Sequence, residues 1–201
     1  MKKYQSHNFI AGKWQSEGTG EFLVVLDKYH AKEIGKIPQA TEQQMEDAIV
    51  AANEAFEITK KWSACKKAEM MQKLYDRLDA RKDEFIDIII NEGGKPRSYA
   101  TNEVDRSLMT LKLAIEEATR FGGEMVPMDW GAGEGKMALT HRFPIGVIAC
   151  ITPFNFPLNL VMHKVAPALA TGCTTVIKPA PQAPMSCLAF AELFEEVGYP
   201  V

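Results

Sequence analysis

The sequence predicts an α/β fold whose second half begins a parallel β-sheet. Two short apolar runs rich in β-branched residues, 145–151 and 174–178, are separated by a segment with helical spacing. That separation is typical of a right-handed βαβ crossover between parallel strands. A further helical pattern over 184–198 begins with proline and is closed by glycine, as helices commonly are. The order β-α-β-α therefore indicates an incomplete Rossmann-type sheet.

The composition is that of an ordinary globular protein, with 46% hydrophobic and 24% charged residues in a chain of 201. The net charge is -3 and the basic residues are dispersed, so we expect no nucleic acid and no membrane as a partner. The most apolar stretch, 143–162, is interrupted by prolines and asparagines, which is wrong for a membrane span. No apolar segment follows the basic start, which argues against a signal peptide. We expect a cytoplasmic protein.

The four cysteines, Cys65, Cys150, Cys173 and Cys187, suggest no metal or redox site. No two of them have the Cys-x-x-Cys spacing of zinc sites and dithiol redox motifs. A chain of this length also has no need of a disulfide framework. We expect reduced thiols and no bound metal.

The N-terminal segment shows strand patterns and turn signals. Residues 8–15, with the glycine-containing stretch after them, are expected to form a strand and a turn. Residues 21–27 are apolar and β-branched, and residues 32–41 alternate apolar with polar side chains. We expect these segments to form a small β meander.

Three helices are expected after the meander. Thr41 and Gln44 have the spacing of a capping box, in which each side chain covers a free backbone N–H group. A second helix is expected from about Ser63 to Asn91 and a third over 98–120, each stopped by glycines. The charged side chains of the third helix are expected on its solvated face: Glu103, Asp105, Arg106, Glu116 and Glu117.

A glycine-rich loop at 122–136 is followed by alternating apolar and polar residues at 136–143. The alternation predicts a half-exposed strand, and we expect this segment to be an arm that pairs with another subunit. We therefore divide the chain into three parts. They are the β meander with the three helices (1–123), the arm (124–143) and the start of the Rossmann-type sheet (144–201).

In the last part, the continuous apolar run 145–151 is expected to be a strand covered on both faces. A helix should begin at Pro157, bend at Pro167 and end at Gly172. The run 174–178 should then form the second strand. The carboxyl ends of these two strands would lie side by side.

Ligands bind at the carboxyl ends of the strands in open parallel sheets. Two loops occupy that position here, TPFNFP (152–157) and KPAPQAP (178–184). In the first, Asn155 offers two N–H donors between prolines, and such a donor can stabilise a developing oxyanion. In the second, Lys178 can bond the ribose hydroxyls or a phosphate of a nucleotide. Spacing alone favours plainer alternatives, an asparagine that caps its own loop and a lysine that extends into solvent.

Taken together, the segment PIGVIACITPFNFPLNLVMHKVAPALATGCTTVIKPAPQAP closely resembles the aldehyde dehydrogenase superfamily. The matching pattern is a strand, P-F-N-F-P, a helix with P-A-L-A-x-G, and V-I-K-P-A. The early FIAGKW and the EDAIVAANEAF helix also resemble the N-terminal region of that family. The resemblance implies an aldehyde-dehydrogenase-like fold and a homo-oligomer, either a dimer or a tetramer. It also implies that residues 1–123 are the N-terminal part of the NAD(P)-binding domain and that residues 124–143 are an oligomerisation arm.

The resemblance also implies NAD(P)-dependent oxidation of an aldehyde to a carboxylic acid. In the family, a cysteine thiolate attacks the carbonyl, a hydride passes to NAD or NADP, and water hydrolyses the thioester. Asn155 matches the family's oxyanion-stabilising asparagine, and Lys178 matches the lysine that contacts the adenosine ribose. Four residues match the loop that faces the cofactor: Ile151, Thr152, Pro153 and Phe154.

Two departures from the family's pattern bear on function. Pro181 stands where many NAD-preferring relatives carry a glutamate for the ribose hydroxyls. Without that carboxylate a 2′-phosphate meets less repulsion, so NADP should be tolerated or used. The second departure concerns the family's nucleophilic cysteine, its general-base glutamate and its nicotinamide-binding loop. In the family these lie in a later part of the chain, and none of them is found in these 201 residues. Neither Cys150 nor Cys173 matches the nucleophile's motif.

The leading interpretation is the N-terminal portion of an NAD(P)-dependent aldehyde dehydrogenase, inactive by itself. A second is a truncated, non-catalytic chain that binds only a nucleotide or a partner subunit. A third is an unrelated nucleotide-binding α/β domain in which Asn155 only caps its loop. A cysteine in a glycine-rich context after Val201 would favour the first over the second. A sharp loss of turnover in Asn155→Ala would exclude the third.

Overall fold

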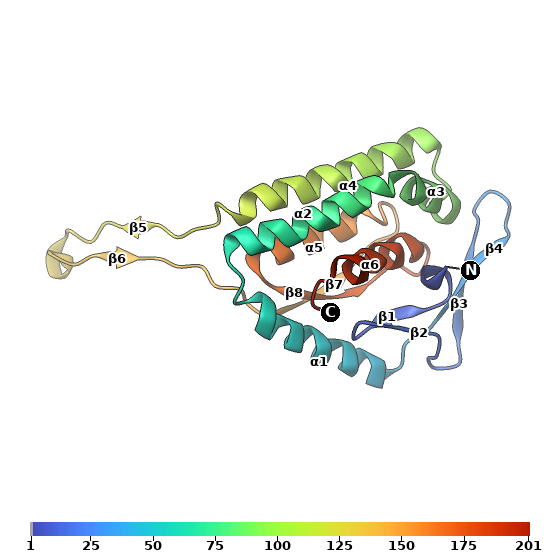
Figure 1. Ribbon diagram of the computed structural model, residues 1–201, viewed down its shortest axis with the longest axis horizontal. Coiled ribbons are helices and arrows are strands. Elements are labelled where there is room, and N and C mark those ends of the chain that lie inside the picture. The colour runs from blue at the N-terminus through green and yellow to red at the C-terminus, as the bar shows by residue number, and fades with distance from the viewer. Residues whose placement is uncertain (1) are drawn as a thin grey trace.

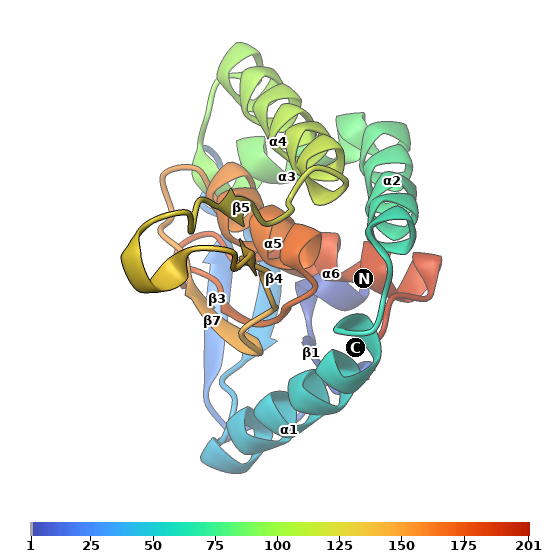
Figure 2. The ribbon, with the colours of Figure 1, turned by 90° about the vertical axis from the view of Figure 1, so that its left-hand side faces the viewer.

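The computed structural model describes residues 2–201 and stacks helices on both sides of a small parallel sheet (Figure 1). Three helices form an outer layer: α2 (Ala64–Ala80), α3 (Lys82–Gly93) and α4 (Arg97–Ala118). Beneath them, α5 (Asn159–Thr171) packs on the sheet, and α6 (Met185–Val197) contacts α2 and α3. Helix α1 (Glu42–Thr59) also packs on the sheet, and Figure 2 shows it on the opposite side of α5 from the outer layer.

The sheet consists of two parallel strands, β7 (Val147–Ile151) and β8 (Thr174–Lys178), connected through α5. Its register pairs the last residues of the strands, Ile151 and Lys178. The predicted βαβ unit is therefore confirmed. The prediction that the first strand is covered on both faces is wrong, because Ala149 and Ile151 are exposed. Within residues 2–201, no element fully covers the face to which these side chains point.

Helices α5 and α6 both end as the sequence predicts, on glycines in the left-handed region. Gly172 after α5 has φ 86°, and Gly198 after α6 has φ 65°, angles that side chains with a Cβ rarely adopt. The start of α5 differs from the prediction. Pro157 lies in a turn, and the helix begins at Asn159.

The hydrophobic core lies between the outer helices and the two helices α5 and α6. Its largest fully buried side chains come from α2 to α6 and include Leu74, Phe85, Leu111, Met162 and Phe190. Because α4 packs along α5, and both α2 and α3 pack on α6, this core holds α5 and α6 in place.

The expected N-terminal meander is instead two separate antiparallel hairpins. The first joins β1 (Asn8–Ile10) to β2 (Lys13–Gln15), and the second joins β3 (Phe22–Leu26) to β4 (Glu33–Pro38). The first had been predicted as one strand with a turn after it. Ala11 and Gly12 both have positive φ, as in a two-residue hairpin turn, and they divide the segment in two.

Helix α1 begins with the predicted capping box. The Gln44 amide donates to Thr41 Oγ1 at 3.1 Å, and the Thr41 amide donates to Gln44 Oε1 at 2.9 Å. Gln44 Nε2 also donates to Gln15 Oε1 at 2.7 Å. The cap therefore fixes the start of α1 against the first hairpin.

The prediction of one helix from Ser63 to Asn91 is wrong, because the helix is interrupted at Arg81. Arg81 leaves the helical conformation, with φ −105° and ψ 17°. Its guanidinium pairs with Glu192 and Glu196 on α6, both at 2.7 Å. The interruption lets two shorter helices, α2 and α3, each pack against α6.

The expected arm is a long antiparallel excursion that leaves the body of the molecule (Figure 1). Only short stretches of it pair as strands, β5 (Met125–Val126) and β6 (Ala138–Leu139). A Cβ on Gly123 would lie 1.7 Å from the Thr140 carbonyl oxygen, so glycine is required where the two sides of the arm meet. Apolar side chains along it face solvent, with Trp130 90% exposed.

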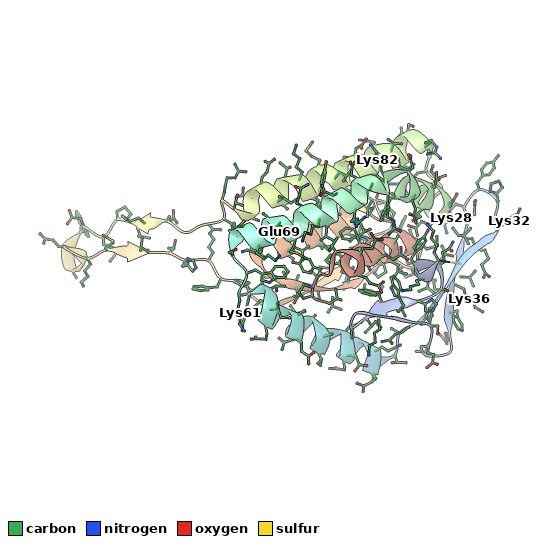
Figure 3. All side chains as sticks on the ribbon, in the orientation of Figure 1. Lys28, Lys32, Lys36, Lys61, Glu69 and Lys82 are labelled. Atoms are coloured by element: carbon green, nitrogen blue, oxygen red, sulfur yellow. The ribbon has the colours of Figure 1, made fainter. Side chains whose placement is uncertain are left out.

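Charged side chains are spread over several elements (Figure 3). Lys28, Lys32 and Lys36 lie on the β3–β4 hairpin, whereas Glu69 and Lys82 lie on α2 and α3. No helix in residues 2–201 is long and apolar enough to cross a membrane. In the same part of the chain, no group of three His, Cys, Asp or Glu side chains is arranged to hold a metal ion.

Candidate functional site

The two loops singled out in the sequence begin side by side at the carboxyl edge of the sheet. The Thr152 amide donates to the Lys178 carbonyl at 3.2 Å, one step beyond the last strand pair. Thr152 is buried at this junction. The first loop then continues to α5 and the second to α6. The predicted proximity of the two loops is confirmed.

Asn155 lies in a bend of the first loop, and its side chain is exposed. It makes no hydrogen bond with any other group in residues 2–201, so the amide does not cap its own loop there. Phe154 and Pro153 before it are exposed, whereas Pro157 after it is buried. The loop is thus held on its helix side, and the Asn155 amide is exposed on the other side of the bend.

The ring of Phe156, directly after Asn155, lies beside two cations. Lys95 Nζ is 4.0 Å from the ring centroid, and the Arg106 guanidinium carbon is 5.5 Å from it. Contacts of this kind are attractive because the face of an aromatic ring is negative. The Phe156 side chain is therefore held by one cation from the connection between α3 and α4 and by one cation from α4.

The loop is also fastened from inside the molecule by Glu103 of α4. Glu103 Oε1 accepts from the amides of Leu158 at 3.0 Å and Asn159 at 3.2 Å, the first turn of α5. Glu103 Oε2 pairs with Lys95 Nζ at 2.5 Å, and the Glu103 side chain is fully buried. The prediction that Glu103 lies on a solvated face is wrong, because this carboxylate caps a helix that has no side-chain cap of its own.

A second buried glutamate does the same for α6. Glu92, in the last turn of α3, accepts from the amides of Met185 at 2.6 Å and Ser186 at 2.9 Å. Burial raises the pKa of Glu92 to about 7, and the neighbouring Glu103 carboxylate acts in the same direction. Hydrogen bonds from the two amides oppose this rise. The carboxylate thus fixes the helix that follows the Lys178 loop.

Sequence reasoning missed both glutamates, although each stands in an unusual place. Glu103 falls within the apolar stripe of α4 formed by Ala100, Val104 and Leu111. Glu92 lies at the carboxyl end of a helix, where the helix dipole disfavours an anion. A charged residue within an apolar stripe, or an anion at the carboxyl end of a helix, indicates a buried hydrogen-bonding partner.

Lys178 ends β8 with an exposed side chain, and it forms no salt bridge within residues 2–201. Pro181 in the loop after it is also exposed. A cavity of about 530 Å³ runs along β8 toward α1 and α6, with Lys178 and Pro181 among its lining residues. Asn155 does not line this cavity. The two predicted site residues therefore share an edge of the sheet but not a cavity.

The donors at this edge suit a nucleotide. Lys178 supplies a free ammonium for hydroxyl or phosphate oxygens, and Ile151 supplies exposed apolar surface beside it. No aspartate or glutamate stands in residues 179–184 to repel a phosphate. The residues present therefore fit the nucleotide part of NAD or NADP.

The buried cysteines near the sheet are poor nucleophiles. Burial raises the pKa of the Cys150 thiol, and it raises the pKa of Cys187 to about 12. The thiolate is the reactive form of cysteine, and both environments disfavour it. All four cysteines are free thiols, and Cys65 is the exposed one.

Comparison with known proteins places these features in context. The family model described as the aldehyde dehydrogenase family matches residues 14–201. The 3-sulfolactaldehyde dehydrogenase of Priestia aryabhattai is 40% identical over 193 residues, 96% of this chain and 40% of that protein. The lactaldehyde dehydrogenase of Methanocaldococcus jannaschii is 35% identical, over 93% of this chain and 39% of that protein.

Solved structures give the same picture. Aldehyde dehydrogenase 21 from Physcomitrella patens, in complex with succinate, superposes with a TM-score of 0.91 at 36% identity, covering 97% of this chain and 40% of that chain. NADP-dependent glyceraldehyde-3-phosphate dehydrogenase from Bacillus halodurans, complexed with NADP, gives a TM-score of 0.91 at 32% identity, covering 98% and 42%. This chain spans about 40% of the length of the curated relatives that it matches.

Proposed function

The chain belongs to the aldehyde dehydrogenase family, and on that premise we propose that it forms the first part of an enzyme that oxidises an aldehyde to a carboxylic acid with NAD or NADP. When bound, the cofactor accepts the hydride. The described residues contribute the carboxyl edge of the sheet, where the two loops begin side by side.

The observation that carries the proposal is the environment of the Asn155 side chain. Its amide is exposed at the ligand-binding edge, and it bonds no other group in residues 2–201. An amide held in this way can donate to the oxygen of a carbonyl that gains negative charge during nucleophilic attack. Asn155 is therefore the proposed catalytic residue of this part of the enzyme.

The cofactor is proposed to bind along the same edge. Lys178 donates to the hydroxyls of the adenosine ribose, and Ile151, Thr152, Pro153 and Phe154 form the wall of the loop that faces the cofactor. Pro181 leaves room, without negative charge, for a 2′-phosphate. NADP is therefore proposed as an acceptable cofactor beside NAD.

The nucleophile and the general base are proposed to lie outside the 201 residues. The buried thiols of Cys150 and Cys187 are kept in the protonated form, which leaves neither suited to attack an aldehyde. The relatives are more than twice as long as this chain, and their additional length can supply both groups.

The test is the substitution Asn155→Ala in the full-length enzyme, assayed with lactaldehyde and succinate semialdehyde as probes. Turnover should fall by a factor on the order of 10² to 10³, because one oxyanion donor is lost. The KM for NADP should stay unchanged, since the Lys178 loop is untouched. Asn53→Ala, an exposed asparagine of α1, is the matched control and should keep full turnover. Full turnover in Asn155→Ala would refute the proposed role.

The arm is proposed to pair with another copy of the chain, giving a dimer or a tetramer. Its exposed apolar side chains and its thin, extended shape support this role (Figure 1).

A further inference from the structure

The segment that follows Asn155 is held by three residues outside the loop, Lys95, Glu103 and Arg106. Glu103 accepts two backbone N–H bonds from the first turn of α5, and Lys95 pairs with the same carboxylate. Lys95 also stacks on Phe156, the residue next to Asn155, and Arg106 lies beside the same ring. A single ion pair, between the partly exposed Lys95 and the buried Glu103, therefore holds both the ring and the helix start.

We propose that Glu103, with Lys95, is a positioning residue that sets the place of the Asn155 amide. The inference rests on the proposed function of Asn155. Residues 156–159 are fixed at both ends, by the cation on the ring and by the carboxylate at the helix start. Asn155 has no hydrogen bond of its own in the described chain, so its place depends on this neighbouring segment.

The chemistry of the contacts suits this role. Hydrogen bonds from backbone N–H groups to a carboxylate are stronger than those to a neutral acceptor, and burial strengthens them further. Glu103 contacts the start of α5 from a helix 55 residues earlier in the chain. These hydrogen bonds therefore do not depend on the conformation of the loop itself. Small displacements of a catalytic donor are costly, because an oxyanion is stabilised only by a donor at hydrogen-bond distance.

Glu92 provides a matched comparison. It is equally buried and also caps a helix with two amide bonds, but it acts on α6 and not on α5. A substitution of either glutamate removes a buried carboxyl cap. Only Glu103 adjoins the segment that carries Asn155.

The experiment is a double-mutant cycle in the full-length enzyme, assayed with NADP and with lactaldehyde and succinate semialdehyde as probes. Glu103→Gln should lower kcat by about tenfold or more, while the KM for NADP changes by less than about twofold. In the Asn155→Ala background, Glu103→Gln should have almost no further effect, because the donor that it positions is gone. Glu92→Gln and Asn155→Ala should instead combine additively.

Each outcome separates the two proposals. If Asn155→Ala keeps full turnover, the proposed function of Asn155 fails and the inference fails with it. If Asn155→Ala is impaired and Glu103→Gln adds its full effect to it, only the positioning role is overturned. Lys95→Met serves where Glu103→Gln does not fold, since it keeps the carboxylate and removes the cation on Phe156. It should likewise lose its effect on kcat in the Asn155→Ala background, and an undiminished effect would overturn the positioning role.

Discussion

Single side chains at the edge of the sheet divide into those that are exposed at the carboxyl ends of the strands and those that hold the backbone. Asn155 and Lys178 were recognisable in the sequence because each is a polar residue beside prolines at the end of an apolar run. Glu103 and Glu92 were not recognised, since their partners lie 55 and 93 residues away in the chain. Long-range caps of this kind need the packing of helices, which a local pattern does not contain.

Pro181 is expected to determine how well the enzyme binds the 2′-phosphate of NADP. Pro181→Glu in the full-length enzyme should weaken NADP relative to NAD by about tenfold, a difference of about 1.4 kcal/mol, because the carboxylate repels the phosphate. Titration of both cofactors by fluorescence measures the ratio. Gln182→Glu, the neighbouring exposed position, is the control and should change the ratio less. A large preference for NAD in the unmodified enzyme would contradict the prediction.

Glu92 should make stability depend on pH. Its pKa of about 7 in the folded state exceeds the usual value, so the folded protein binds the extra proton. The stability that Glu92 contributes is full below about pH 4.5 and is lost as the pH rises through about 7. The loss is on the order of 3 kcal/mol.

The measurement is the Tm of the full-length protein and of Glu92→Gln across this pH range. The glutamine does not titrate, so the Tm advantage of the unmodified protein over the variant should shrink as the pH rises. A difference that stays constant from pH 5 to about pH 8 would show that the carboxyl keeps one charge state throughout.

At the scale of elements, helix ends followed local chemistry closely. The capping box of α1, the glycine stop after α5 and the glycine stop after α6 all lie where the sequence predicts them. The break at Arg81 was missed because no glycine or proline marks it. Its cause is a set of ion pairs to α6, which only the folded chain brings together.

Thr41→Ala tests the contribution of the α1 cap. The substitution removes the acceptor for the Gln44 amide and should lower the free energy of unfolding by about 1 kcal/mol. The midpoint of denaturant unfolding of the full-length protein measures this. Thr110→Ala is the control, because the Thr110 hydroxyl bonds a carbonyl on the exposed side of α4 and caps no helix start. Equal midpoints for the two variants would count against the cap.

At the scale of the whole molecule, the arm and the sheet edge both present surface that residues 2–201 do not cover. The arm exposes Trp130, Met137, Leu139 and Phe143 together. The sequence predicted an arm from alternation alone, but it overestimated the strand at 136–143, because only two residues on each side pair. Much of the arm is extended without strand pairing.

Removal of the arm should change the assembly of the full-length protein. Replacing residues 124–139 by two glycines is sterically simple, because Gly123 and Thr140 are already in contact. The solution mass, measured by light scattering after size exclusion, should fall from that of a dimer or tetramer to a lower state. Tyr29→Ser, at an exposed aromatic residue of the β3–β4 hairpin, is the control and should leave the mass unchanged. An unchanged mass without the arm would refute its role in assembly.

The capping of α6 by Glu92 has a consequence for how this protein can evolve. Since the start of α6 is secured from α3, the exposed residues Pro181 and Gln182 have no part in starting the helix and are released from that constraint. Cofactor preference can drift by substitution at these two positions while the scaffold stays intact. Among related sequences we expect variety at 181–182 and a retained acid at the position of Glu92. Laboratory selection for a new cofactor would find its accessible mutations at the same two positions.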